Sequence, residues 1–208
     1  MNVEAVTVDA YGTLVTLSDP VPALRSALAV QGIERDQEAV ERAFREEIEY
    51  YVKRSHEGRD EATLALLRRD CAAVFLAAAD AGLDPDAFAP AFLDALSFLP
   101  VDGAVDACRA LAAAGMKIAV VSNWDVGLHE HLRALGLDSL VDTVVTSAEA
   151  GAPKPSPAIF ELALSRLGTR SDRVVHVGDD AADAEGARAA GIRFEPAPLR
   201  DAAARILA

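Results

Sequence analysis

The second half of the chain alternates between short apolar runs and longer amphipathic segments, and this pattern limits the folds that it can adopt. The runs "MKIAVVSN", "LVDTVVTS", "DRVVHVGD" and "IRFEP" are short and mostly rich in Val, as expected of buried strands. Between them lie "GLHEHLRALG", "PAIFELALSRLG" and "ADAEGARAAG", which suit helices that end at Gly. Strands that alternate with helices predict an α/β fold, with a parallel sheet covered by helices on both faces.

A long helical segment separates the first strand from this alternating region. Residues 3–8 form a Val-rich run typical of a buried strand, whereas residues 19–97 contain no strand-like run and predict four helices. In the second of these helices, an apolar stripe recurs every three to four residues: Val40, Phe44, Ile48 and Tyr51. We therefore expect a βα core, residues 1–15 and 99–208, that is split by an all-helical insert, residues 16–98.

Composition narrows the classes of partner. The net charge of -13 disfavours nucleic acid and anionic membranes, although a local positive charge could still hold a small anionic substrate. Cys71 and Cys108 lie far apart in apolar segments, which favours two buried thiols in a reducing cytosol. The first ten residues lack a basic segment, and no apolar run approaches about 18 residues, so we expect a cytoplasmic protein without a signal peptide or membrane span.

Polar residues follow each of the first four strands of the predicted sheet. Because the carboxyl ends of parallel strands meet at one edge, we expect these residues to gather there. In chain order, they are Asp9, Tyr11, Gly12 and Thr13, then Ser122 and Asn123, then Lys154, and finally Asp179, Asp180 and Asp183. Several of them have simpler alternative roles as turn formers or helix caps.

The chemistry of these residues suits an anionic substrate and a divalent cation. Gly12 and Thr13 form a tight turn with a hydroxyl placed to meet an anion, and two prolines hold Lys154 as a fixed positive charge. The acids after the fourth strand would repel one another unless a cation joined them. Carboxylate oxygens are ligands that Mg²⁺ prefers.

Four motifs in order resemble those of the haloacid dehalogenase-like hydrolase superfamily. They are "DAYGTL" at 9–14, "VVSN" at 120–123, "KPSPAIF" at 154–160 and "HVGDDAADAEGARAAG" at 176–191. The resemblance covers the whole core and implies a Rossmann-like catalytic domain. It also implies that the helical insert is the cap domain that subfamily I carries after the first motif.

The resemblance assigns a role to each candidate residue. Asp9 would be a nucleophile that forms a covalent intermediate, which water then hydrolyses. Ser122, Thr13 and Lys154 would hold the transferred group and offset its charge. Asn123, the last residue of the second motif, would be a further catalytic residue.

The remaining candidates would serve a metal ion. Asp179 would bind Mg²⁺ together with the Asp9 carboxylate and the main-chain carbonyl of Tyr11. Asp180 and Asp183 would position the metal or the lysine.

Tyr11 is a departure from the phosphatases of this superfamily, which have a second Asp at that position. The side chain of that Asp protonates the leaving group, and a phenol with a pKa near 10 is a poor substitute at neutral pH. Since general acid catalysis contributes about 10²–10⁴-fold, we expect slow turnover or a restriction to good leaving groups.

Several functions remain open at this point. "DAYGT" also resembles the metal-independent 2-haloacid dehalogenases, but those have Tyr where this chain has Phe160, and they lack its acids at 179–180. Because Lys154 is the only cation among these acids, charge favours a Mg²⁺-dependent phosphatase acting on a small phosphate ester. A weakly active or non-catalytic protein is a third alternative. A carbon–phosphorus hydrolase that uses Lys53 is a fourth. The protein could be a monomer or a homodimer.

Overall fold

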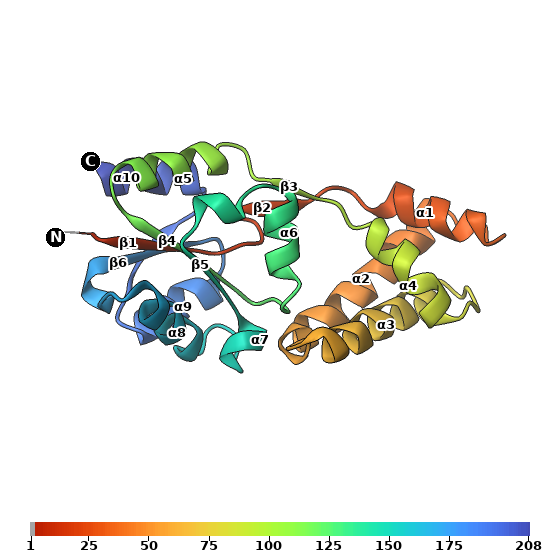
Figure 1. Ribbon diagram of the computed structural model, residues 1–208. Helices are drawn as coiled ribbons and strands as arrows, with labels where there is room; N and C mark the ends of the chain where they lie inside the picture. Colours follow the sequence, from red (N-terminus) through yellow and green to blue (C-terminus); the bar gives the residue numbers. More distant parts are fainter. Residues whose placement is uncertain (1–2) are drawn as a thin grey trace. The chain divides into compact units, whose positions relative to one another are not determined.

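The computed structural model describes residues 3–208, which divide into two compact units (Figure 1). One unit, called here the α/β unit, contains the residues up to Thr16 together with Leu99–Ala208. The other, the helical unit, is Leu17–Phe98. The chain passes between them twice, and the two passages pair as a two-stranded sheet of β2, Val15–Leu17, and β3, Phe98–Pro100. The predicted segment 1–15 begins with two residues that lie outside the described part.

The α/β unit contains one parallel sheet of five strands in the order β5-β4-β1-β6-β7. The strands are β1, Ala5–Val8; β4, Lys117–Ser122; β5, Thr143–Thr146; β6, Val174–Gly178; and β7, Arg193–Pro196. The predicted α/β class and the parallel sheet are confirmed. β1 is the central strand, and successive strands extend the sheet first on one side of it and then on the other.

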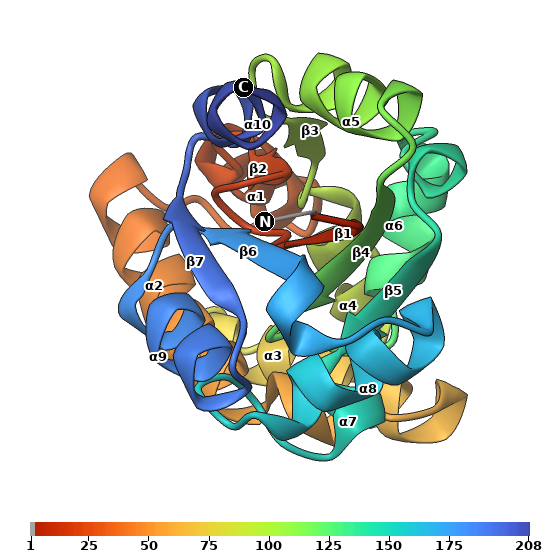
Figure 2. The ribbon, with the colours of Figure 1, turned by 90° about the vertical axis from the view of Figure 1, so that its left-hand side faces the viewer.

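Helices cover both faces of this sheet. α8 and α9 lie on one face, and α5 and α10 lie on the other (Figure 2). The helices of the unit are α5, Ala104–Ala113; α6, Leu128–Ala134; α7, Ser147–Ala150; α8, Ala158–Leu167; α9, Ala181–Ala189; and α10, Leu199–Leu207. Under α8 and α9, the fully buried side chains of Val121, Val145 and Phe160 are part of a continuous apolar core. That core fixes the position of the strands relative to the helices on this face.

The helical unit consists of four helices, as predicted. They are α1, Val21–Val30; α2, Gln37–Arg54; α3, Glu61–Ala78; and α4, Pro85–Asp94. An Asp side chain caps the start of each of α2, α3 and α4 by accepting a hydrogen bond from a main-chain N–H in the first turn. A cluster of buried aromatic rings joins α3 to α4, with Phe75 packed against Phe88 and Phe92.

One detail of the predicted stripe on α2 is wrong. Val40 and Phe44 are buried as expected, but Ile48 is 40% exposed, and the neighbouring acid Glu47 is buried in its place. The sequence spacing alone does not determine whether residue 47 or residue 48 faces the core. The packing of α2 on α3 determines it. A carboxyl group therefore lies inside the core of this unit.

The remaining regular structure consists of three short 3₁₀ turns, Ser55–Glu57, Asp138–Leu140 and Ser171–Arg173. Cys71 and Cys108 are both buried and form no disulfide, which confirms the predicted state of the thiols. Within residues 3–208, no helix has the combination of length and apolar character that crossing a membrane requires.

Candidate active site

The register of the central strands brings three of the predicted residues to one edge of the sheet. Val8 of β1 pairs with Val120 of β4 and with Val177 of β6. Asp9, Ser122 and Asp179 therefore emerge from neighbouring strands within one or two residues of the same level. This is the carboxyl edge beside the central strand, where the strand order reverses and where ligands of such sheets bind.

Lys154 forms the centre of the site. Its Nζ lies 2.5 Å from Asp9 Oδ1 and 2.5 Å from Asp183 Oδ1, and the residue is only 6% exposed. Ser122 Oγ donates a hydrogen bond of 3.1 Å to the same oxygen of Asp9. Ionised groups are buried at a large cost unless partners surround them, so this arrangement is a specifically built polar cluster.

Asn123 holds the backbone of Lys154 in place. The Asn123 Nδ2 donates to the carbonyl of Lys154 at 3.1 Å, and the Lys154 N–H donates to Asn123 Oδ1 at 2.6 Å. Both ends of the Asn123 amide are thus used to position the lysine. Asn123, a predicted catalytic residue, therefore contacts the loop that carries Lys154.

Asp183 reaches the cluster from the first turn of α9. Its Oδ1 accepts hydrogen bonds from Lys154 and from Nε2 of His176, the latter at 2.8 Å. A Cβ atom on Gly178 would collide with the Asp183 side chain, so β6 must end in glycine for this approach. Burial disfavours ionisation of Asp183, but the hydrogen bond from His176 and the charge of Lys154 hold its pKa well below its usual range.

Asp9 and Lys154 perturb one another in the same buried environment. Burial raises the pKa of Asp9 to about 6, an increase that the ammonium of Lys154 partly offsets. Burial alone would lower the pKa of Lys154, but the charges of Asp9 and Asp183 outweigh it and raise that pKa above its usual value. At neutral pH the lysine is therefore charged, and Asp9 is an ionised carboxylate beside it.

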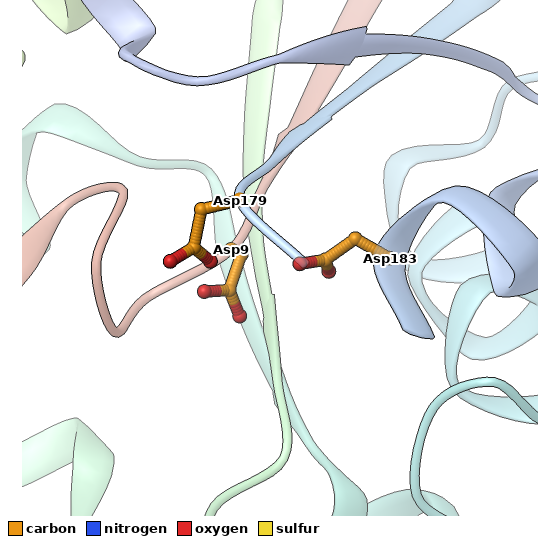
Figure 3. Close-up of side chains that lie close together, drawn as sticks. All are labelled: Asp9, Asp179 and Asp183. Atoms are coloured by element: carbon orange, nitrogen blue, oxygen red, sulfur yellow. The ribbon is translucent and has the colours of Figure 1, made fainter. Parts of the chain in front are cut away.

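Asp179 completes a cluster of three carboxylates. Oxygen atoms of Asp9, Asp179 and Asp183 all lie within 4.8 Å of one another (Figure 3). Gly12 has a φ of +80°, and a Cβ atom there would run into the Asp179 carboxylate, so glycine is required at this position twice over. Burial and the charges of Asp183 and Asp180 raise the pKa of Asp179, as expected of crowded acids.

This set of oxygen atoms fits the predicted Mg²⁺. Hard oxygen ligands and a local excess of negative charge are what this ion requires. Asp183 is already held by Lys154 and His176, which leaves Asp9 and Asp179 as the carboxylates best able to face a cation.

The other predicted residues take up different positions. Asp180 is exposed and caps α9, where its Oδ1 accepts from the Asp183 N–H at 2.8 Å, and it does not belong to the three-carboxylate cluster. The side chain of Tyr11 is about half exposed. Thr13 is fully buried, and its Oγ1 is the one buried side-chain polar atom without a hydrogen-bond partner in the described part of the chain. Such an atom costs about 1–3 kcal/mol, so the hydroxyl of Thr13 still requires a partner.

Two residues of the network were not identified from the sequence. His176 lies inside a run predicted to be a buried strand, and it is fully buried, with the acid that holds Lys154 as its hydrogen-bond partner. Thr7 received no role, yet its Oγ1 lies 3.0 Å from Nδ1 of His176. The local signal was the two-residue spacing between Thr7 and Asp9, which is typical of one face of a strand. That Thr7 is the register partner of His176 follows only from the pairing of β1 with β6.

The geometry therefore places a carboxylate, a fixed ammonium and a second acid at the edge of a parallel sheet. A model of the haloacid dehalogenase-like hydrolases matches residues 3–191. The chain belongs to this family of hydrolases. The resemblance noted in the four sequence motifs is confirmed by this match, which extends over nearly the whole chain.

Relatives within the family differ in their named activities. The chain is 38% identical over 122 residues to a ribulose-1,5-bisphosphate 5-phosphatase of Halopiger xanaduensis, covering 56% of this chain but only 50% of that protein. It is 27% identical over 195 residues to an (S)-2-haloacid dehalogenase of Pseudomonas putida, covering 89% and 80% of the two chains. A solved dehalogenase structure superimposes with a TM-score of 0.67 at 26% identity, covering 92% of this chain and 83% of that one.

Proposed function

We propose that the protein is a Mg²⁺-dependent phosphatase that acts on a small phosphorylated metabolite through a covalent intermediate on Asp9. The observation that carries this proposal is the cluster of Asp9, Asp179 and Asp183, two of which contact the buried ammonium of Lys154. A phosphate dianion would be repelled by three acids and one lysine, whereas a bound divalent cation would reverse that balance. The partial match to a named phosphatase supports the same class of substrate.

The residues of the cluster have distinct tasks in this reaction. A carboxylate oxygen of Asp9 forms a bond to phosphorus as the bond from phosphorus to the leaving oxygen breaks, and that oxygen takes a proton from solvent. Water then attacks the phosphorus of the acyl phosphate, which releases phosphate and restores Asp9. Lys154 and Ser122 orient the carboxylate before attack, and Thr13 supplies a hydroxyl for the phosphoryl oxygens.

Mg²⁺, when bound, would offset the charge of the phosphoryl group. We propose Asp9, Asp179 and the main-chain carbonyl of Tyr11 as its protein ligands. Asp183 supports the site by holding Lys154, and Asp180 supports it by fixing the first turn of α9.

The proposal extends to the organisation of the chain. Residues 1–15 and 99–208 would act as the catalytic core and residues 16–98 as a cap domain that determines the substrate. Cys71 and Cys108 form no disulfide, which supports a cytoplasmic location, because disulfides are rare in reducing compartments.

Release of p-nitrophenol from p-nitrophenyl phosphate, with and without Mg²⁺, tests the proposal. Because p-nitrophenolate is a good leaving group, the absence of an acid at Tyr11 should matter little, and an alkyl phosphate should react about 10²-fold more slowly or worse. Asp9→Asn is the control for contaminating phosphatases. Turnover that requires both Mg²⁺ and Asp9 is the expected result, and rates equal to those of Asp9→Asn would refute the proposal.

A metal-independent 2-haloacid dehalogenase is the second candidate. Tyr11 at the second position after Asp9 favours it, as does the match along most of the chain to a dehalogenase of P. putida. In that case Asp9 would displace chloride from carbon, and the halide would leave without an acid. Release of chloride from 2-chloropropionate in the presence of EDTA would favour this function over the phosphatase.

A further inference from the structure

A buried row of hydrogen bonds connects β1 to Lys154 by way of His176. Thr7 Oγ1 lies 3.0 Å from His176 Nδ1, His176 Nε2 lies 2.8 Å from Asp183 Oδ1, and that oxygen lies 2.5 Å from Lys154 Nζ. Thr7, His176 and Asp183 are all fully buried. The row continues to Asp9, which Lys154 Nζ also contacts and which follows the end of β1, two residues after Thr7.

The Asp183 carboxylate fixes the direction of the hydrogen bond at Nε2 of the imidazole. The Asp183 carboxylate only accepts, so Nε2 of His176 must carry the hydrogen that lies between them. Nδ1 faces two oxygen atoms of Thr7, the hydroxyl at 3.0 Å and the main-chain carbonyl at 3.2 Å. Because burial lowers the pKa of His176, the ring is neutral and this nitrogen is bare, so it accepts from the hydroxyl, which can donate, and forms no hydrogen bond with the carbonyl. The opposite tautomer would place two acceptors, Nε2 and Asp183 Oδ1, in contact at 2.8 Å. The Thr7 hydroxyl therefore stabilises the tautomer that Asp183 requires.

Aromatic packing holds the ring in this orientation. The rings of Phe160 and His176 pack edge to face, with a centroid distance of 4.9 Å and an interplanar angle of 84°. A Cβ atom on Gly186 would strike the ring of Phe160, so α9 approaches closely enough to confine it. The imidazole has little freedom to turn away from Asp183.

We propose that His176 is a positioning residue, which orients the Asp183 carboxylate and thereby sets the place of the Lys154 ammonium at Asp9. This role rests on the proposed function of the site. Asp183 Oδ1 accepts from His176 and Lys154 together. Without the donor on His176, the carboxylate keeps only Lys154 at Oδ1 and a long hydrogen bond of 3.4 Å from the Asp180 N–H at Oδ2. It can then shift, and the lysine moves with it. The rate of attack by Asp9 then falls, although the substrate still binds.

Two amide substitutions separate this role from mere packing. His176→Gln can place its amide N–H where Nε2 lies, whereas His176→Asn carries the same amide on a side chain one carbon shorter. We expect His176→Gln to retain kcat for p-nitrophenyl phosphate within about threefold. His176→Asn should lose about 10- to 100-fold in kcat with little change in KM, as is typical when an outer hydrogen-bond partner is removed. Equal kcat values for the two variants would overturn the proposal.

Phe194→Leu is the matched control. It removes packing against the His176 ring but none of the hydrogen bonds. It should lower the stability and leave kcat unchanged. A fall in kcat equal to that of His176→Asn would show that packing alone accounts for the effect and would overturn the positioning role.

Nitrogen-15 NMR of the wild-type protein tests the same proposal without any turnover. The expected spectrum shows a protonated Nε2 and a bare Nδ1 on His176, and Thr7→Val should shift the Nδ1 resonance most. A protonated Nδ1 with a bare Nε2 would overturn the proposal whatever the enzyme hydrolyses. Wild-type protein without phosphatase activity would instead refute the proposed function and leave this measurement to decide the role of His176.

Discussion

Glu47, a buried acid of the helical unit, and Asp183, a buried acid of the α/β unit, have pKa shifts in opposite directions. Glu47 in the helical unit is 4% exposed, and burial raises its pKa to about 7, with a hydrogen bond from Cys71 as a weak counterweight. Asp183 in the α/β unit is completely buried, yet its pKa lies below its usual range because His176 and Lys154 surround it. Burial by itself makes a carboxyl group neutral, and only a set of charged or donor partners keeps it ionised.

The difference arises from how each unit assembles its polar groups. In the α/β unit, neighbouring strands deliver Thr7, Asp9, His176 and Ser122 to one region in fixed register. In the helical unit, α2 meets α3 through an otherwise apolar contact, and a thiol is a poor donor. The sheet edge can therefore hold an ionised nucleophile, whereas the core of the helical unit cannot.

Lys154→Met should cause the largest change in the free energy of unfolding. The substitution leaves Asp9 and Asp183 buried without their common partner, so we expect the α/β unit to lose about 3–5 kcal/mol in free energy of unfolding. Urea denaturation measures the loss. Lys117→Met is the matched control, because that lysine donates one hydrogen bond to a carbonyl, that of Leu167, and lies at the surface. A loss from Lys154→Met no larger than that of the control would contradict the account.

Glu47→Gln should raise the free energy of unfolding, whereas Lys154→Met lowers it. The folded-state pKa of about 7 lies above the usual 4.5. The protein therefore has its full stability below about pH 4.5, and it loses part of that stability as the pH rises through 7, because ionising the buried Glu47 is costly. The substitution should therefore stabilise the protein by on the order of 2 to 3 kcal/mol at pH 8 and by little at pH 4.5. Denaturation at both pH values, with the exposed Glu46→Gln as control, measures this. A gain that is independent of pH would show that Glu47 is not neutral in the folded state.

Ser122→Ala should have the smallest effect. It removes one of two donors to Asp9 Oδ1 and leaves Lys154 in place, so we expect a loss of about 1 kcal/mol in stability and about tenfold in kcat. Ser147→Ala is the control, because Ser147 is equally buried and donates to the carbonyl of Trp124. It should cost similar stability and no activity. Equal activities of the two variants would remove Ser122 from the site.

The alternating strands and helices were predictable because each Val-rich run is short and bounded by Gly or polar residues. Two helices of the α/β unit, α7 and α10, were not. α7 spans only Ser147–Ala150, and α10 buries just Leu199, Ala202 and Ala203, so neither has a pattern long enough to be recognised.

The sequence predicts the site residues that follow the ends of strands, but not those that meet through the pairing of two strands. Asp9, Ser122 and Lys154 are in contact because the strand ends coincide. Asp180 and Asp183 could not be distinguished, since both fit the start of a helix, and only the approach past Gly178 shows that Asp183 enters the cluster. The link through His176 depends on the pairing of β1 with β6, which no local pattern records.

Mass spectrometry of the peptide that contains Asp9, after acid quenching during turnover of p-nitrophenyl phosphate with Mg²⁺, tests the central claim most directly. The account predicts a fraction of this peptide that carries one additional phosphoryl group on Asp9, and none in Asp9→Asn. Quenching at low temperature, where hydrolysis of the intermediate is slow, should increase that fraction. Steady turnover with no phosphorylated Asp9 under any of these conditions would contradict the assignment of Asp9 as the nucleophile.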